Sequence, residues 1–193
     1  MSSLRLPIAL MFVLLLAADG VGALAQTGAD YKVLATNKTS TMEKELNEAA
    51  EAGFRFQHVM GGESAFGGSE VVVVMSSHEA GAGRFAYRLL ATSRTSTMQR
   101  ELQEASDAGF EYRGQTVFRS TFGGDEVVVI LERDNDAEPH QYEYTLVATS
   151  RTSTLEKELK EAGAAGYEVV GMTVSKTAVG GDEVVAIARR LRP

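Results

Sequence analysis

Residues 91–110 read ATSRTSTMQRELQEASDAGF, and nearly the same letters stand at residues 35–54 (ATNKTSTMEKELNEAAEAGF) and 148–167 (ATSRTSTLEKELKEAGAAGY). Each copy is followed by a second repeated stretch, which reads FGGSEVVVVM at residues 66–75, FGGDEVVVIL at 122–131 and VGGDEVVAIA at 179–188. Equivalent residues are offset by 56 positions between the first two copies and by 57 between the last two. The repeats therefore predict three tandem copies of one structural unit.

Each repeat opens with the pattern of a strand followed by a helix. Apolar residues alternate with others at the two-residue period of a strand, and the three strands begin at Tyr31, Tyr87 and Tyr144. A Ser-Thr-Met/Leu-Glu/Gln sequence then predicts a capping box, in which a serine hydroxyl accepts a backbone N–H bond at the start of a helix. The three predicted capping serines are Ser40, Ser96 and Ser153.

The predicted helix has one apolar face and a defined end. Apolar residues at helical spacing form that face, namely Met42, Leu46 and Ala49, then Met98, Leu102 and Ala105, then Leu155, Leu159 and Ala162. A glycine in the left-handed conformation commonly ends a helix, and the candidates are Gly53, Gly109 and Gly166. A β-rich stretch, a Gly-Gly pair and a valine-rich run follow, which together predict a hairpin. Each unit is therefore expected to be β-α-β-β.

The last strand of each unit indicates how the units pack. Residues 71–74 and 127–130 are apolar at consecutive positions, so both faces of these strands should be buried. One helix covers only one face of a sheet. We therefore predict an α+β fold with mainly antiparallel sheets, in which the most apolar strand lies in the middle of each sheet. The three units are expected to form a pseudo-threefold body with sheets inside and helices outside, although a homo-oligomer would supply the same burial.

The chain divides into a leader, three repeat units and the segments between them. Residues 1–25 have a short basic start, an apolar run of 13 residues and small residues before Gln26, which is typical of a secretory signal peptide. The apolar run is shorter than the roughly 20 residues that span a bilayer as a helix. The expected boundaries are 26–30 for an N-terminal linker, 31–75, 85–133 and 142–193 for the units, and 76–84 and 134–141 for the linkers.

Composition and charge exclude several classes of function. The formal net charge is −7, and cleavage after residue 25 removes only Arg5 and Asp19, so the acidic excess persists. We therefore expect no nucleic-acid partner, since nucleic acid is bound mainly through basic patches, and no stable membrane insertion after cleavage. The chain has no cysteine, so it has no disulfides, thiolate metal ligands or cysteine nucleophile. The leader predicts a periplasmic or secreted protein.

The third unit resembles a family of short bacterial domains of unknown function. The resemblance is carried by Tyr144 in the first strand and by LEKELKEAGAAGYEVV at residues 155–170. In that family a Tyr-containing strand precedes a helix that ends in a Leu-Gly-x-Glu-Gly-Trp-Glu-Leu-Val type of motif, and a hairpin follows. Here the tryptophan is replaced by Phe54, Phe110 or Tyr167, and the unit occurs three times. The resemblance implies a fold and carries over no functional residues.

The usual catalytic and metal-binding patterns are not visible in the repeats. His58 aligns with two glycines, and His78 and His140 fall in the linkers, so the three histidines share no position. The repeated Glu-Leu-x-Glu sequence on the helix fits exposed ion pairs with Lys44, Arg100 and Lys157 better than acid–base chemistry. We therefore predict no catalytic residues, no metal site and no cofactor.

One repeated loop is a candidate for binding a small anion. A cation and two hydroxyl residues precede each helix, where backbone N–H groups and the helix dipole attract negative charge. The nine residues are Lys38, Thr39 and Ser40, Arg94, Thr95 and Ser96, and Arg151, Thr152 and Ser153. Phosphate, sulfate or a carboxylate could bind there. Plain helix capping explains the same residues.

These observations favour a non-enzymatic binding or assembly module over an enzyme. Its partner would be a protein or a small molecule, and an oligomer is compatible with the sequence. One alternative is a binder of a small anionic ligand at the helix N-termini. Another is a hydrolase with a site between units, because unit 1 departs from the repeat at four polar positions. These are Asn37, Arg55, His58 and Ser69, where unit 3 has Ser150, Glu168, Gly171 and Asp182.

Overall fold

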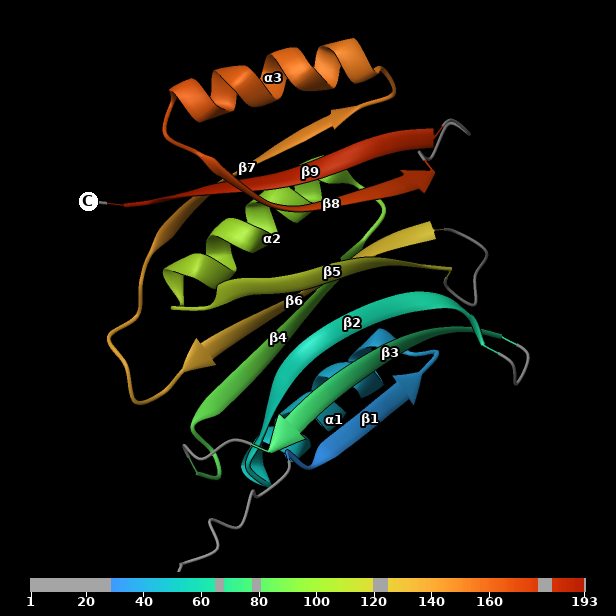
Figure 1. Ribbon diagram of the computed structural model, residues 1–193, viewed down its shortest axis with the longest axis vertical. Coiled ribbons are helices and arrows are strands. Elements are labelled where there is room, and N and C mark those ends of the chain that lie inside the picture. Colours follow the sequence, from blue (N-terminus) through green and yellow to red (C-terminus); the bar gives the residue numbers. More distant parts are fainter. Residues whose placement is uncertain (1–28, 65–67, 78–80, 120–124, 177–181, 193) are drawn as a thin grey trace, which may run out of the picture.

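The computed structural model describes residues 29–64, 68–77, 81–119, 125–176 and 182–192. In this part of the chain it contains three helices and nine strands, which are stacked along one long axis (Figure 1). The predicted signal peptide lies outside the described residues, as do the predicted Gly-Gly turns apart from Gly68. No helix among the described residues is both long and apolar enough to span a membrane.

The elements follow the predicted order in all three units. Unit 1 contains β1 (Tyr31–Thr36), α1 (Thr39–Glu51), β2 (Phe54–Ser64) and β3 (Gly68–Ser77). Unit 2 contains β4 (Phe85–Thr92), α2 (Thr95–Asp107), β5 (Glu111–Arg119) and β6 (Asp125–Asp134). Unit 3 contains β7 (Tyr142–Thr149), α3 (Thr152–Ala164), β8 (Glu168–Lys176) and β9 (Asp182–Leu191). The prediction of three tandem β-α-β-β units in an α+β fold is confirmed.

Each unit has its own three-stranded antiparallel sheet. The strand orders are β1-β3-β2, β4-β6-β5 and β7-β9-β8, so the last strand of each unit lies in the middle, as predicted. The second strand of each unit contains an irregularity in register, which falls between Phe56 and His58, between Tyr112 and Gly114, and between Val169 and Gly171. Such a bulge takes backbone groups out of the ladder. Those groups then need partners from elsewhere.

The helices begin earlier than the predicted capping boxes. Their N-cap residues are Lys38, Arg94 and Arg151, and none of these makes a side-chain capping bond. The capping-box prediction is therefore wrong, because Ser40, Ser96 and Ser153 lie inside the first helical turn. A threonine at the end of the preceding strand orders each loop instead. Thr36 Oγ1, for example, accepts a hydrogen bond from Lys38 N at 3.1 Å.

The predicted helix ends are confirmed. Gly53, Gly109 and Gly166 follow the helices with φ of +91°, +81° and +83°, in the left-handed region that favours glycine. The predicted apolar faces of α1 and α2 are buried, whereas α3 has no buried residue. Since the three helices are nearly identical in sequence, this difference must come from their position in the stack.

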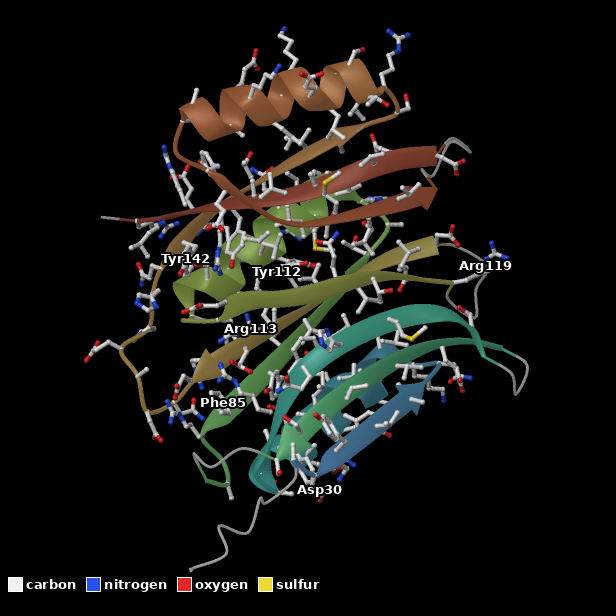
Figure 2. The ribbon with its side chains drawn as sticks, viewed as in Figure 1. Asp30, Phe85, Tyr112, Arg113, Arg119 and Tyr142 are labelled. Carbon is white, nitrogen blue, oxygen red and sulfur yellow. The ribbon has the colours of Figure 1, made fainter. Side chains whose placement is uncertain are left out.

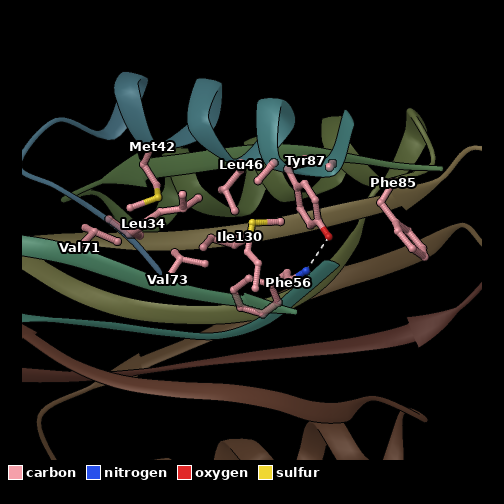
Figure 3. Packing of buried hydrophobic residues seen from close by; sticks show 13 residues of the cluster. Leu34, Met42, Leu46, Phe56, Val71, Val73, Phe85, Tyr87 and Ile130 are labelled. Atoms are coloured by element: carbon pink, nitrogen blue, oxygen red, sulfur yellow. Dashed lines mark hydrogen bonds between the residues drawn. The ribbon is translucent and has the colours of Figure 1, made fainter. Parts of the chain in front are cut away.

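The units pack in a row, and each unit contacts its neighbour. Most of the described buried hydrophobic residues belong to two clusters, of which one joins unit 1 to unit 2 and the other joins unit 2 to unit 3. The first cluster contains Met42 and Leu46 of α1 together with Tyr87 and Ile130 of the unit 2 sheet (Figure 3). The expected pseudo-threefold body with shared central sheets therefore needs correction. In units 2 and 3, the second face of the sheet is covered by the helix of the preceding unit, so no common centre forms.

This packing explains why the last strands differ in burial. All five residues from Val127 to Leu131 in β6 are buried, because α2 covers one face of the sheet and α1 covers the other. In β3, burial alternates, with Val71 and Val73 buried and Val72 and Val74 only half-buried. The prediction that both faces of β3 are buried is therefore wrong. Among the described residues, no second helix covers the other face of the unit 1 sheet (Figure 1).

Gly171 shows how closely the units approach, and its replacement by alanine is expected to lower the free energy of unfolding by about 1–3 kcal/mol. A Cβ atom at this position would overlap the Tyr112 hydroxyl and Gln115 Oε1 of the preceding unit. Gly163→Ala is the control, because nothing lies within 4 Å of a Cβ there and alanine favours helix over glycine by about 1 kcal/mol. Chemical denaturation of both variants measures the difference. Equal stabilities for G171A and wild type would contradict the close approach.

Candidate functional site

A buried tyrosine fastens unit 2 to the bulge in unit 1. Tyr87 lies in β4 at the edge of the unit 2 sheet, and its hydroxyl accepts a hydrogen bond from Phe56 N at 2.8 Å. Phe56 is the residue at the β2 bulge, so the tyrosine supplies a partner for the backbone group there. The same hydroxyl donates to Glu132 Oε2 at 2.8 Å. This contact joins the two units through one side chain.

Glu132 is the centre of a buried ionic cluster at the same seam. Its side chain is only 1 % exposed and lies 2.9 Å from Arg55 Nη2 of unit 1 and 2.7 Å from Arg113 Nη2 of unit 2. Arg55 Nε also donates to both carboxylate oxygens, and its guanidinium lies over the Phe85 ring at 4.3 Å from the centroid. A buried charge is tolerated only when it is paired in this way.

The seam between units 2 and 3 repeats this design with the charges exchanged. Tyr144 accepts a hydrogen bond from Tyr112 N at 3.0 Å, as Tyr87 does from Phe56. The position of Glu132 is taken by Arg189, and that of Arg55 by Glu111, with 3.9 Å between Arg189 Nη1 and Glu111 Oε2. Tyr112 and Tyr142 lie close to this seam in Figure 2. Each seam therefore places opposite charges across it, whereas Arg55 set against Arg189 would bring like charges together.

Helix side chains cover the edge strand of the following unit. Asn47 of α1 donates to Tyr87 O and accepts from Tyr87 N, both at 2.9 Å, and Glu43 Oε2 accepts from Leu89 N at 2.8 Å. Gln103 of α2 makes the equivalent bonds to Tyr142 O and Tyr144 N. These bonds satisfy backbone groups at a sheet edge, which would otherwise be free to pair with another strand.

Burial of the seam tyrosines predicts a loss of stability at alkaline pH. Burial raises the pKa of Tyr87, with the Glu132 charge adding to the effect, and burial also raises the pKa of Tyr144. Burial and the neighbouring Tyr144 raise the pKa of Tyr112 to about 12. Because the folded state holds these protons more tightly than the unfolded state, their contribution is complete below the ordinary pKa of 10.0 and is lost as the pH rises above it.

The measurement is the free energy of unfolding from neutral pH upward, followed together with tyrosinate absorbance. We expect stability to fall between pH 10 and about 12, the window set by the ordinary and the raised pKa of Tyr112. Tyr112→Phe should flatten this decline, because phenylalanine has no proton to lose. A decline of the same steepness in the variant would contradict the assignment.

The two ends of the stack expose the surfaces that the seams bury. Tyr31 is 65 % exposed, whereas its equivalents Tyr87 and Tyr144 are 4 % and 3 % exposed. All the exposed large hydrophobic side chains among the described residues belong to unit 1 or unit 3, namely Tyr31, Val33, Met60, Val169, Met172, Val174 and Leu191. Unit 2 contributes none in its described part. Apolar patches of this kind commonly mark interaction sites.

We call the first of these surfaces the first-unit face. It is the side of the β1-β3-β2 sheet that faces away from α1, and in Figure 1 no described helix or strand lies in front of β1 and β3. The strand register places its residues on one side, namely Tyr31, Val33, Ala35, His58, Met60, Val72, Val74 and Ser76. In unit 2 the equivalent face is buried against α1. In units 2 and 3 this face receives the helix and second strand of the preceding unit, so we call it the receiving surface. The first-unit face is a receiving surface on which no described helix lies.

The second surface is the last-unit face, formed by the α3 side of unit 3 along β8. Its exposed apolar residues are Val169, Met172 and Val174. In unit 1 the residues equivalent to the first two are Phe56 and Val59, which approach Gly114 of unit 2. The last-unit face therefore corresponds to the surface of unit 1 that packs on unit 2, but its apolar residues are exposed.

The predicted anion-binding loops lie one in each unit, before α1, α2 and α3. Thr39 and Ser40 line a hollow of about 390 Å³ between units 1 and 2, together with the carboxylates of Glu43 and Glu101. None of the other predicted anion-binding residues lines this hollow. Carboxylates repel an anion, so this hollow does not favour one, and anion binding at the nine loop residues stays a prediction.

A second hollow, of about 260 Å³, lies beside the segment that links units 2 and 3. It contains His140, whose Nδ1 lies 3.0 Å from Glu111 Oε1, together with Arg113 and Tyr142. The residues that line it include no serine, threonine or cysteine, but they include three acidic residues, Glu111, Asp134 and Glu138. His58 is exposed on the first-unit face, and His78 lies outside the described residues.

The predicted ion pairs on the helices are present and exposed. Lys44 lies 3.3 Å from Glu48, and the equivalent pairs in α2 and α3 are 3.6 and 3.8 Å apart. Among the described residues, no group of three or more histidine, aspartate or glutamate side chains has a metal-binding arrangement. The seam pairs, in contrast, join different units, and no spacing within one repeat predicts them.

Comparison of the chain with protein-family models, with curated proteins and with solved structures found no match in any of the three. The resemblance of unit 3 to the bacterial domain family therefore stays a prediction. The features of this molecule that bear on its function are therefore the seams and the two end faces.

Proposed function

We propose that the protein is a non-enzymatic binding or assembly module that acts through the first-unit face and the last-unit face. The observation that carries the proposal is the contrast between equivalent tyrosines. Tyr87 and Tyr144 are buried in a seam and hydrogen-bonded to a neighbouring unit, whereas Tyr31 is exposed with its apolar neighbours. Surfaces that are complementary inside the chain are free to bind at its ends.

The leader sequence supports action outside the cytoplasm, in the periplasm or after secretion. An exported protein without cysteine depends on packing for its stability, and the two seam clusters supply that packing. The hydrolase alternative is not favoured by the hollow at His140, because His140 is paired with Glu111 in an exposed contact beside the segment that links units 2 and 3. The seams are filled by structural contacts, which favours binding over catalysis.

An apolar dye tests whether the end faces are available for binding. At concentrations where the protein is monomeric, the dye bis-ANS should bind with a rise in fluorescence. A double variant with Val33→Glu and Met172→Glu should lose most of that rise, because both residues are at least half exposed on the two faces. Ala82→Glu is the matched control, since it adds the same charge in an exposed turn. Equal dye binding by the double variant and wild type would contradict the proposal.

A further inference from the structure

The seams define what an end face is built to bind. Both seams use the same pair of surfaces. The receiving surface is the sheet face that bears the tyrosine, and the donating surface is the helix and the bulged second strand of the preceding unit. Unit 1 retains the receiving residues, and unit 3 retains the donating ones. A partner that fits the first-unit face is therefore one that carries the last-unit face, and every copy of this chain carries it.

We infer that a second copy of this chain binds to the first, with the last-unit face of one copy seated on the first-unit face of the next. The inference rests on the proposed function and names its partner. The two faces differ, so the contact is head-to-tail, and a contact of this kind continues into a ring or an open filament. Unit 1 and α3 lie at opposite ends of the long axis (Figure 1), so the two faces are far apart on one molecule and can each bind a different copy.

The alignment of the three units predicts the contacts in the joint between two copies. Tyr31 of one copy occupies the place of Tyr87 and Tyr144, and Val169 of the other copy occupies that of Phe56 and Tyr112. Val169 lies at the β8 bulge, as Phe56 lies at the β2 bulge. The Tyr31 hydroxyl therefore accepts the Val169 N–H bond, and Val33, Val72 and Val74 lie against α3.

The side chains at the centre of the joint are complementary in size. Within the chain, a large residue lies against glycine, as Phe56 does against Gly114 and Tyr112 does against Gly171. Between two copies the order of sizes is reversed. The receiving surface has His58 in place of glycine, and the donating surface has the smaller Val169 in place of Phe56 or Tyr112. The volume gained by histidine is offset by the volume lost at valine. His58 thus fits a joint made by unit 3 better than one made by unit 1 or unit 2.

The charges at the joint also allow unit 3 of one copy to pack on unit 1 of the next. Glu168 of unit 3 occupies the donating position of Arg55 and Glu111, and Ser76 of unit 1 occupies the receiving position of Glu132 and Arg189. Glu168 therefore meets a neutral hydroxyl, which can donate a hydrogen bond to it. A face-to-face pairing of two first-unit faces would instead bring Tyr31 against its own copy and leave the bulge at Val169 unpaired.

The joint between copies should be weaker than the seams within a chain. Asn47 and Gln103 both donate to and accept from the edge strand of the next unit, but their equivalent in α3 is Lys160. An ammonium group has donors and no acceptor, so it can bond Tyr31 O and leaves Tyr31 N without this partner. The joint also lacks a charge pair. We therefore expect reversible, concentration-dependent association.

Complementation between two variants tests this inference by sedimentation velocity. Val33→Glu blocks the receiving face and leaves the donating face intact, and Met172→Glu does the opposite. Wild type should increase in mass beyond dimer as its concentration rises, and each variant alone should stay monomeric. An equal mixture of the two should form a dimer and stop there, because only one functional joint exists between them. Circular dichroism checks that both variants are folded, and Ala82→Glu should behave as wild type.

Two results would overturn the inference. Self-association of the Met172→Glu variant alone would show that first-unit faces pair with each other. Wild type that stays monomeric at every concentration would show that the faces do not bind a second copy. The dye experiment then separates the two proposals: dye binding that depends on Val33 and Met172 keeps the end faces as binding surfaces for another partner, whereas its absence removes both.

Discussion

Replacing Glu132 by alanine is expected to lower the free energy of unfolding by about 3–5 kcal/mol, the cost of removing one partner from a buried ion pair. The substitution leaves two guanidinium groups, Arg55 and Arg113, beside each other without their shared carboxylate. It also removes the acceptor of the Tyr87 hydroxyl. Since this cluster lies in the seam, units 1 and 2 should separate more easily.

Denaturation by urea, followed by circular dichroism, measures this effect. Ser76→Ala is the matched control, because Ser76 is the equivalent residue of unit 1, is also buried, and lies in no charge cluster. The control should change stability by less than about 1 kcal/mol. If both variants lose the same amount of stability, the ionic cluster does not hold the seam.

Replacing Leu102 by alanine is expected to cost about 2–5 kcal/mol, whereas the same change at Leu159 should cost clearly less. The two leucines are equivalent in sequence and lie on the apolar faces of α2 and α3. Leu102 is fully buried between its own sheet and unit 3, but Leu159 is only half-buried, because α3 packs against strands β7 and β8 of its own unit. The difference between two equivalent residues isolates the contribution of stacking.

This comparison requires protein concentrations at which wild type is monomeric. Under those conditions Leu46→Ala in α1 should behave like Leu102→Ala, since Leu46 is equally buried. A ranking in which the three leucine variants are equally destabilised would mean that each unit buries its helix without help from a neighbour. That result would contradict the stack.

The sequence was sufficient to predict the architecture of one unit. The alternation around Tyr87, the apolar spacing of Met98, Leu102 and Ala105, and the stop at Gly109 each reflect local geometry, which is visible in a single repeat. The prediction that Ser96 caps its helix was wrong. Its hydroxyl has the right spacing for a cap, but the helix begins earlier, at Thr95, because Thr92 orders the loop before it.

The stack and the end faces were not predicted, because they depend on contacts between units. Arg55 and His58 stood out as departures of unit 1 from the repeat, yet nothing local says why a unit needs them. One signal was available in the aligned repeats. The position of Arg55 becomes Glu111 in unit 2, and the position of Glu132 becomes Arg189 in unit 3. This opposite change of charge indicates that the two positions meet across a seam.

The joint between copies can be located directly with the lysines that the chain already contains. Nitrogen-15-labelled and unlabelled protein are mixed in equal amounts, treated with a short amine-reactive cross-linker and digested for mass spectrometry. Head-to-tail stacking predicts linked peptides that join Lys160 of one copy to Lys32 of another, because α3 then lies beside β1. These pairs should contain one labelled and one unlabelled peptide. Mixed pairs that join Lys32 only to Lys32, or no mixed pairs at all, would contradict head-to-tail assembly.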